Sequence, residues 1–183
     1  SPTRTPTPAL SPTTTPTATA TTTPSPTANP SPTPTATPSA ATRVIMAAGD
    51  IVCGSGTTTG WCRQQQTSDL ILAHNPDAIL ALGDVQYECA QMFDFTTYFD
   101  PTWGRFKSKI YPTTGNHEYK TSTNPSDVCY GAPPSAQDYF AYFGPVAGDP
   151  AKGYYSFNLG AWHLVALNSN CSQVGGCAAG SAQ

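Results

Sequence analysis

Three apolar segments of this chain each end in a glycine followed by a residue with an oxygen-bearing side chain. The segments cover Arg43–Ala48, Asp77–Leu82 and Lys109–Thr114, and each has the character of a buried parallel strand. They are followed by Gly49-Asp50, Gly83-Asp84 and Gly115-Asn116-His117-Glu118. One Gly-Asp pair is ordinary turn chemistry, but two such pairs followed by Gly-Asn-His-Glu, each after an apolar segment, are not. Because ligands of open α/β sheets gather at the carboxyl ends of strands, the pattern predicts one shared metal site.

The first 42 residues differ in composition from the rest. They hold 11 of the chain's 19 prolines, and most of the others are Thr, Ser or Ala. Such a segment buries too little apolar surface to offset the entropy of ordering it. We expect a disordered, extended Pro/Thr/Ser-rich linker over residues 1–42, which could carry O-linked sugars and follow a further module. Residues 43–183 are then expected to form the folded domain.

Charge and hydropathy argue against two classes of partner. All 11 acidic residues and 7 of the 8 basic ones follow residue 42, and the net charge of the chain is −3. We expect no nucleic-acid-binding surface, because no basic face is present for counterion release. We expect no membrane span, because no apolar run approaches the roughly 20 residues that cross a bilayer. The chain opens at Ser1 rather than Met, so a signal peptide could have been removed or omitted.

All six cysteines lie in the expected folded domain. None forms a Cys-x-x-Cys pair, which disfavours a zinc knuckle and favours disulfides. We expect near neighbours to pair, which gives Cys53–Cys62, Cys171–Cys177 and, as the remainder, Cys89–Cys129. Together with the linker, these disulfides indicate a secreted, extracellular protein.

Helices and strands alternate along the rest of the domain, which predicts the α/β class. In chain order we expect a helix over Thr67–Ala73, a helix over Met92–Phe99, a polar loop over Tyr119–Ala136, a further helix, and a hairpin of Tyr154–Asn158 with Ala161–Asn168. Pro76 and Pro101 follow the ends of the first two helices. The polar loop is expected to border the site.

The three strand-end motifs resemble the first three motifs of the calcineurin-like metallophosphoesterases. The second motif is matched over Gly83-Asp84-Val85-Gln86-Tyr87, and residues 154–164 resemble a stretch that follows the motifs in secreted bacterial members. The resemblance covers essentially all of residues 43–183. It implies the N-terminal half of an αββα sandwich.

The family's chemistry implies a role for each matching residue. Asp84 would bridge two metal ions, Asp50 would bind the first ion and Asn116 the second. His117 matches a family histidine that is not a ligand; it would contact the phosphate and protonate the leaving oxygen. The resemblance thus implies hydrolysis of phosphate monoesters, small-molecule substrates, by a hydroxide that two metal ions activate. Phosphodiesters and nucleotides stay open as substrates.

Tyr87 is a candidate for a further metal ligand. Val52 stands where the common first motif has a metal-binding histidine. The purple acid phosphatase branch also lacks that histidine and uses a tyrosine three residues after the bridging aspartate, which is the position of Tyr87. A phenolate suits a hard ion such as ferric iron, but Fe, Mn and Zn all stay open. The alternative is a tyrosine packed beside the site with its hydroxyl hydrogen-bonded.

The family completes its site with later histidines that this chain does not contain. Its histidines are His74, His117 and His163. His74 ends a helix, where a cation suits the helix dipole, and His163 lies in a strand, so both are expected to be structural. We expect a chain that is incomplete at its carboxyl end and shows little phosphatase activity alone. Two functions stay open: a two-metal phosphoesterase, and a non-catalytic extracellular binding module with the same fold, tethered by the linker.

Overall fold

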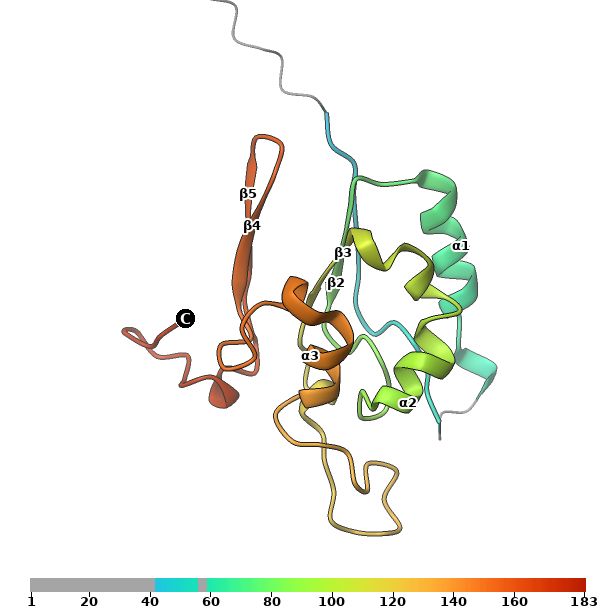
Figure 1. Cartoon of the computed structure of the whole chain (residues 1–183), viewed down its shortest axis with the longest axis vertical. Coiled ribbons are helices and arrows are strands. Elements are labelled where there is room, and N and C mark those ends of the chain that lie inside the picture. Colours follow the sequence, from blue (N-terminus) through green and yellow to red (C-terminus); the bar gives the residue numbers. More distant parts are fainter. Residues whose placement is uncertain (1–41, 56–58) are drawn as a thin grey trace, which may run out of the picture. The chain divides into compact units, whose positions relative to one another are not determined.

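A computed structural model describes residues 42–55 and 59–183 (Figure 1). The expected linker, apart from Thr42, lies outside the described residues.

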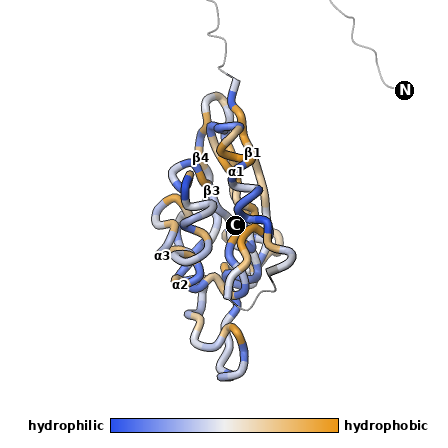
Figure 2. Tube along the Cα trace, turned by 90° about the vertical axis from the view of Figure 1, so that its right-hand side faces the viewer, coloured by the Kyte–Doolittle hydropathy of each residue, from blue (hydrophilic) through white to orange (hydrophobic). Residues whose placement is uncertain are grey.

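A parallel sheet of three strands forms the centre of the fold. The strands are β1 (Ile45–Ala48), β2 (Ala78–Leu82) and β3 (Ile110–Thr113), in the order β1-β2-β3. Ile45 pairs with Ala78, and Ile79 pairs with Ile110. Figure 2 shows the hydrophobic character of the trace at β1. The three predicted parallel strands are confirmed, each slightly shorter than its apolar segment.

Asp77 holds the segment before β1, which begins two residues later than expected. Its carboxylate accepts hydrogen bonds from the Arg43 guanidinium at 2.9 Å and from the backbone N–H of Val44 at 2.8 Å. The chain before β1 is therefore held by this side chain and also by the backbone, because the N–H groups of Asp77 and Ala78 donate to the carbonyl of Val44 at 2.8 and 3.4 Å.

The helix between β1 and β2 is α1 (Gln64–His74). It ends at Asn75, which has a left-handed backbone (φ 43°) and donates its N–H to the carbonyl oxygens of Ile71 and Leu72. Pro76 follows, where a helix cannot readily continue. The predicted helix and its end are confirmed.

The second predicted helix is divided into two parts. An α-helical turn, α2 (Met92–Asp94), leads into a wider π-helical turn, η2 (Phe95–Phe99), where the N–H of Asp100 bonds to the carbonyl of Phe95. Both Phe95 and Phe99 contact the ring of Phe143, 5.7 and 5.6 Å away between centroids. Phe143 belongs to α3 (Gln137–Phe143), the further helix that was expected before the hairpin.

Short 3₁₀ segments complete the helical parts. They are η1 (Thr59–Trp61), η3 (Trp103–Lys109), η4 (His117–Tyr119), η5 (Gly144–Ala147) and η6 (Cys171–Gln173). The largest fully buried side chains of the core include Trp103, Tyr139, Phe95, Phe99 and Ile79.

The predicted hairpin is confirmed as β4 (Tyr155–Leu159) and β5 (Trp162–Ala166), an antiparallel pair. It is a separate two-stranded sheet that packs on β3. The ring of Phe157 stacks on Tyr111 with 3.7 Å between centroids, and the hydroxyl of Tyr155 donates to the carbonyl of Pro112 at 2.9 Å. In Figure 1 the hairpin and α1 lie on opposite sides of β2 and β3.

The cysteines pair as expected: Cys53–Cys62, Cys89–Cys129 and Cys171–Cys177. Three disulfides are typical of proteins from oxidising compartments. No helix in the described part of the chain is long and apolar enough to cross a membrane.

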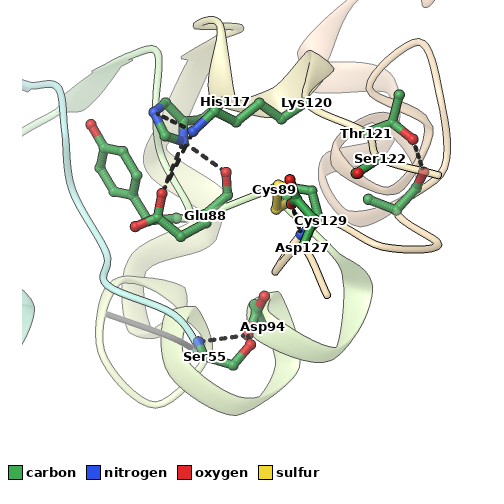
Figure 3. Close-up of a disulfide and its surroundings, with 12 residues drawn as sticks. Ser55, Glu88, Cys89, Asp94, His117, Lys120, Thr121, Ser122, Asp127 and Cys129 are labelled. Carbon is green, nitrogen blue, oxygen red and sulfur yellow. Dashed lines mark hydrogen bonds and ion pairs between the residues drawn. A yellow bond between two sulfur atoms is a disulfide. The ribbon is translucent and has the colours of Figure 1, made fainter. Parts of the chain in front are cut away.

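Residues 120–136 form the expected irregular loop, with only an isolated bridge between Ser122 and Tyr130. The Cys89–Cys129 disulfide and Ala132 form a small buried cluster of their own (Figure 3).

Candidate functional site

A shallow polar pocket of about 170 Å³ lies at the carboxyl ends of β1, β2 and β3. Its lining includes Asp50, Asp84 and Asn116, one residue from each of the three strand-end motifs. We refer to it as the metal pocket, after the metal site that the sequence pattern predicts at this edge. The structure therefore brings together the three residues that the sequence pattern assigned to one site, and it does so at the edge where the parallel-sheet rule places ligands.

Asp50 and Asp84 lie side by side because β1 and β2 continue to pair beyond their last regular residues. The N–H of Asp50 bonds to the carbonyl of Gly83 at 3.3 Å, and the N–H of Ile51 bonds to the carbonyl of Asp84 at 3.0 Å. Both aspartates have left-handed backbones, with φ of 53° and 46°. Such a conformation is uncommon for a residue other than glycine and is concentrated at functional sites.

Glycines allow the loops after β2 and β3 to approach each other closely. A Cβ atom on Gly83 would lie 2.9 Å from Cα of Gly115. A Cβ on Gly115 would overlap the carboxylate and the backbone nitrogen of Asp84. These two glycines are therefore required by the close packing of the metal pocket.

The hydroxyl of Tyr87 joins the two aspartates. It donates a hydrogen bond to Oδ1 of Asp50, and its oxygen lies 3.3 Å from Oδ2 of Asp84. Burial, this hydrogen bond and the negative charges of both aspartates raise the pKa of Tyr87. The phenol is therefore a neutral donor, and its oxygen lies among the oxygens that a cation would bind.

Glu118 ties the loops of the metal pocket together from inside the protein. Its side chain is buried, and its carboxylate accepts hydrogen bonds from the backbone N–H groups of Asp84 (3.0 Å), Val85 (2.8 Å) and Gly115 (2.6 Å). Burial raises its pKa to about 7, against the lowering effect of the three N–H donors. The sequence analysis gave Glu118 no role. The sequence feature that could have indicated a role is its position in the third motif, directly after His117.

His117 binds Asp84 through its backbone rather than through its ring. Its N–H donates to Oδ1 of Asp84 at 2.9 Å. Nδ1 of the ring lies 2.7 Å from the carbonyl oxygen of Glu88, to which it donates, and Nε2 accepts from Lys120 Nζ at 3.3 Å (Figure 3). The ring packs edge-on against Tyr87, 4.3 Å between centroids. Both ring nitrogens of the expected proton donor therefore have partners, and His117 is not among the residues that line the metal pocket.

The other two histidines lie outside the metal pocket. His74 is the last residue of α1, and His163 contacts Oδ1 of Asn158 across the hairpin at 2.8 Å. Val52, at the position of the missing family histidine, is fully buried in the core.

Ser169 and Asn170 also line the metal pocket, and the sequence analysis did not identify them. The buried Asn168 holds this segment in place. Its amide donates to the hydroxyl of Tyr119 at 2.8 Å, and its Oδ1 accepts the N–H of Asn170 at 2.8 Å. By contrast, none of residues 120–136 lines the metal pocket, but the loop reaches the expected catalytic residue, because Nζ of Lys120 donates to Nε2 of His117 at 3.3 Å. Its disulfide joins the loop to Cys89, which follows Tyr87 by two residues.

The side chains around the metal pocket fit a hard cation. Asp50, Asp84, Tyr87 and Asn116 offer two carboxylates, a phenol and an amide, all of which bind through oxygen. The described residues contain no group of three or more His, Cys, Asp or Glu side chains that could hold a metal ion, so a binding site depends on Tyr87 and Asn116. No family model, no curated protein and no solved structure matches this chain.

Proposed function

We propose that this chain belongs to a secreted, metal-dependent phosphoesterase that hydrolyses phosphate monoesters. The observation that carries the proposal is the convergence of Asp50, Asp84 and Asn116 on one pocket at the carboxyl edge of the parallel sheet, with the Tyr87 hydroxyl between the two aspartates. The motif resemblance supplies the reaction class, and the three disulfides support an extracellular location.

The proposal includes the finer fold, the N-terminal half of the calcineurin-like αββα sandwich. Two features support it: a parallel sheet with helices against it, and a second sheet, β4–β5, packed on that sheet through Tyr111 and Phe157.

Asp84 has the surroundings that a bridging ligand needs. Oδ2 faces Tyr87 and, through it, Asp50, while Oδ1 faces the loop that carries Asn116. Asp50 and Tyr87 would hold one ion and Asn116 the other, with Asp84 shared between them. Two bound ions would lower the pKa of a water molecule and stabilise negative charge on the phosphoryl oxygens. Glu118 keeps the Asp84 and Asn116 loops at a constant separation.

Metal binding by the full chain tests this proposal directly. We expect calorimetry with Mn²⁺ or Zn²⁺, checked by elemental analysis, to give two ions per chain. Asp84→Ala should lose both ions, because it removes the shared ligand. Asp149→Ala, a change at an exposed carboxylate paired with Lys152, is the matched control and should bind normally. Undiminished binding by Asp84→Ala would overturn the proposal.

Hydrolysis is then measured on the metal-loaded protein with a chromogenic phosphate monoester. We expect a low rate, because the sequence lacks the later histidines of the family. His117→Ala should keep the ions and slow the remaining hydrolysis by roughly 10²–10⁴-fold, as for loss of a general acid. Loss of metal in this variant would contradict the assigned role.

A non-catalytic binding module with the same fold is the second candidate. It is favoured by one observation: both ring nitrogens of His117 are engaged by Glu88 and Lys120, and His117 does not line the metal pocket. This candidate predicts metal and phosphate binding without any hydrolysis that His117→Ala reduces.

A further inference from the structure

A second pocket lies beside the metal pocket and shares Asp50 with it. Its volume is about 150 Å³, and its lining includes Cys53, Trp61, Arg63 and Trp103. We refer to it as the indole pocket. An apolar cavity of about this volume binds benzene in another protein, so the indole pocket has room for one six-membered ring.

Trp61 lies at the indole pocket with its ring in solvent. Its exposed fraction is 87%, so the indole contributes little to the core. Its backbone is nevertheless held in place, because Trp61 ends η1 and the next residue, Cys62, forms the disulfide with Cys53. An exposed indole on an anchored backbone offers a large, rigid ring on which a flat ligand can stack.

The other tryptophan of the indole pocket is fixed. Trp103 is fully buried, and its Nε1–H donates to Oγ1 of Thr67 at 3.3 Å. The indole pocket therefore combines an ordered apolar wall with an exposed aromatic ring.

Arg63 adds a positive charge to the same pocket. Its side chain is exposed, and its guanidinium donates to the carbonyl of Cys62 at 3.0 Å. Among residues 42–55 and 59–183, no carboxylate forms an ion pair with Arg63. Its remaining N–H groups are able to donate to acceptor atoms of a ligand.

We propose that the indole pocket binds a planar aromatic ring carried by the leaving group of a phosphate ester whose phosphate lies at the metal pocket. This inference rests on the proposed function and assigns its substrate class. Trp61 stacks on the ring, and Arg63 donates hydrogen bonds to acceptor atoms on the ring. Aryl phosphates and nucleoside monophosphates both carry an aromatic ring that can stack on Trp61. They differ because a nucleobase offers hydrogen-bond acceptor atoms to Arg63.

Binding of non-hydrolysable ligands to the Mn²⁺-saturated full chain tests the proposal. The ligands are inorganic phosphate, methylphosphonate, phenylphosphonate and the phosphonate analogue of adenosine monophosphate, each titrated by calorimetry. We expect the two aromatic ligands to bind about 10-fold more tightly than methylphosphonate, the effect typical of one aromatic stack. Trp61→Ala should remove this preference and leave the affinities for inorganic phosphate and methylphosphonate unchanged, whereas Trp61→Phe should keep most of it.

Two further variants sharpen the test. Trp162→Ala removes another exposed tryptophan, on β5 and outside both pockets, and should change nothing. Arg63→Ala should weaken the adenosine ligand more than phenylphosphonate, which has no ring acceptor. Equal losses for these two ligands would limit Arg63 to a general attraction of anions and overturn its assigned role.

The outcomes separate this inference from the proposed function. Binding of phosphate and methylphosphonate without a preference for aromatic ligands, or with a preference that Trp61→Ala retains, overturns the indole pocket alone. Aromatic binding that depends on Trp61 but not on Mn²⁺ supports the indole pocket and contradicts the proposed function. Absence of binding by all four ligands overturns both.

Discussion

The carboxylate of Glu118 accepts a hydrogen bond from the backbone N–H of Asp84 at 3.0 Å. This contact joins the loop after β3 to the loop after β2 from beneath the metal pocket. Two more N–H groups, of Val85 and Gly115, bind the same carboxylate. The separation of the candidate metal ligands therefore depends on a buried side chain that itself binds no metal.

Removal of the Glu118 carboxylate should loosen the metal pocket and destabilise the fold. Glu118→Ala leaves three N–H groups without their acceptor, each costing about 1–3 kcal/mol when buried, so we expect a loss of at least about 3 kcal/mol. Glu118→Gln should cost less, because its amide oxygen keeps part of the network. Urea unfolding measures stability, and metal titration at a temperature where the variant is folded should show 10–100-fold weaker binding. Metal affinity equal to wild type in a folded Glu118→Gln would refute the positioning role.

Gly115→Ala should damage the metal pocket without removing a polar group. The new Cβ would overlap the Asp84 carboxylate, so Asp84 or its loop must move. We expect a loss of about 1–3 kcal/mol in stability and a large loss of metal affinity. Gly60→Ala is the control, because a Cβ there meets no atom within 4 Å. The same metal affinity in both variants would contradict the packing argument.

Tyr87→Phe distinguishes the two roles considered for this tyrosine. If the phenol binds the first ion, the chain loaded with ferric iron should be coloured by the iron–phenolate pair, and Tyr87→Phe should bleach it. The fold should survive, because only one hydroxyl is removed. Absorption spectra and iron content are measured on the same samples. A colourless wild-type protein that retains its iron would show that Tyr87 only packs beside the ions and bonds to Asp50.

The sheet, and the part of the metal pocket that Asp50, Asp84 and Asn116 form, could be predicted from local sequence. β1, β2 and β3 are apolar segments that end in glycine, and parallel strands present their carboxyl ends at one edge. Asn75-Pro76 marks the end of α1 by backbone sterics alone. Each of these predictions depends on residues that are neighbours in the chain.

The part of the metal pocket that Ser169 and Asn170 form depends on contacts between residues far apart in the sequence. Ser169 reaches the pocket because Phe157 stacks on Tyr111 and Asn168 bonds to Tyr119. These contacts join segments about 50 residues apart, and no local pattern encodes them. The pairing of Cys89 with Cys129 was predicted correctly, but the contact between Lys120 of the same loop and the His117 ring was not.

The ring orientation of His117 was also beyond sequence reasoning. It depends on the carbonyl oxygen of Glu88, a backbone atom with no sequence signature. The motif predicted that His117 lies next to the site, and its backbone N–H does bind Asp84. Motif spacing, however, carries no information on side-chain rotamers.

Asp77→Asn should change how the stability of the fold depends on pH. The N–H of Val44 and the Arg43 guanidinium hold the pKa of Asp77 below its ordinary value of 3.8. A carboxylate whose pKa is lowered by folding stabilises the protein fully above its unfolded pKa, and the contribution disappears as the pH falls through the folded pKa. Wild type should therefore lose this contribution as the pH falls below about 3.8, whereas Asp77→Asn should lack it at every pH. Urea unfolding of both proteins between pH 2 and pH 7 measures the difference. Arg43→Gln, which removes one of the two partners, should show a smaller effect in the same direction. A stability difference between wild type and Asp77→Asn that stays constant over this range would show that the charge of Asp77 contributes nothing through its bonds to Arg43 and Val44.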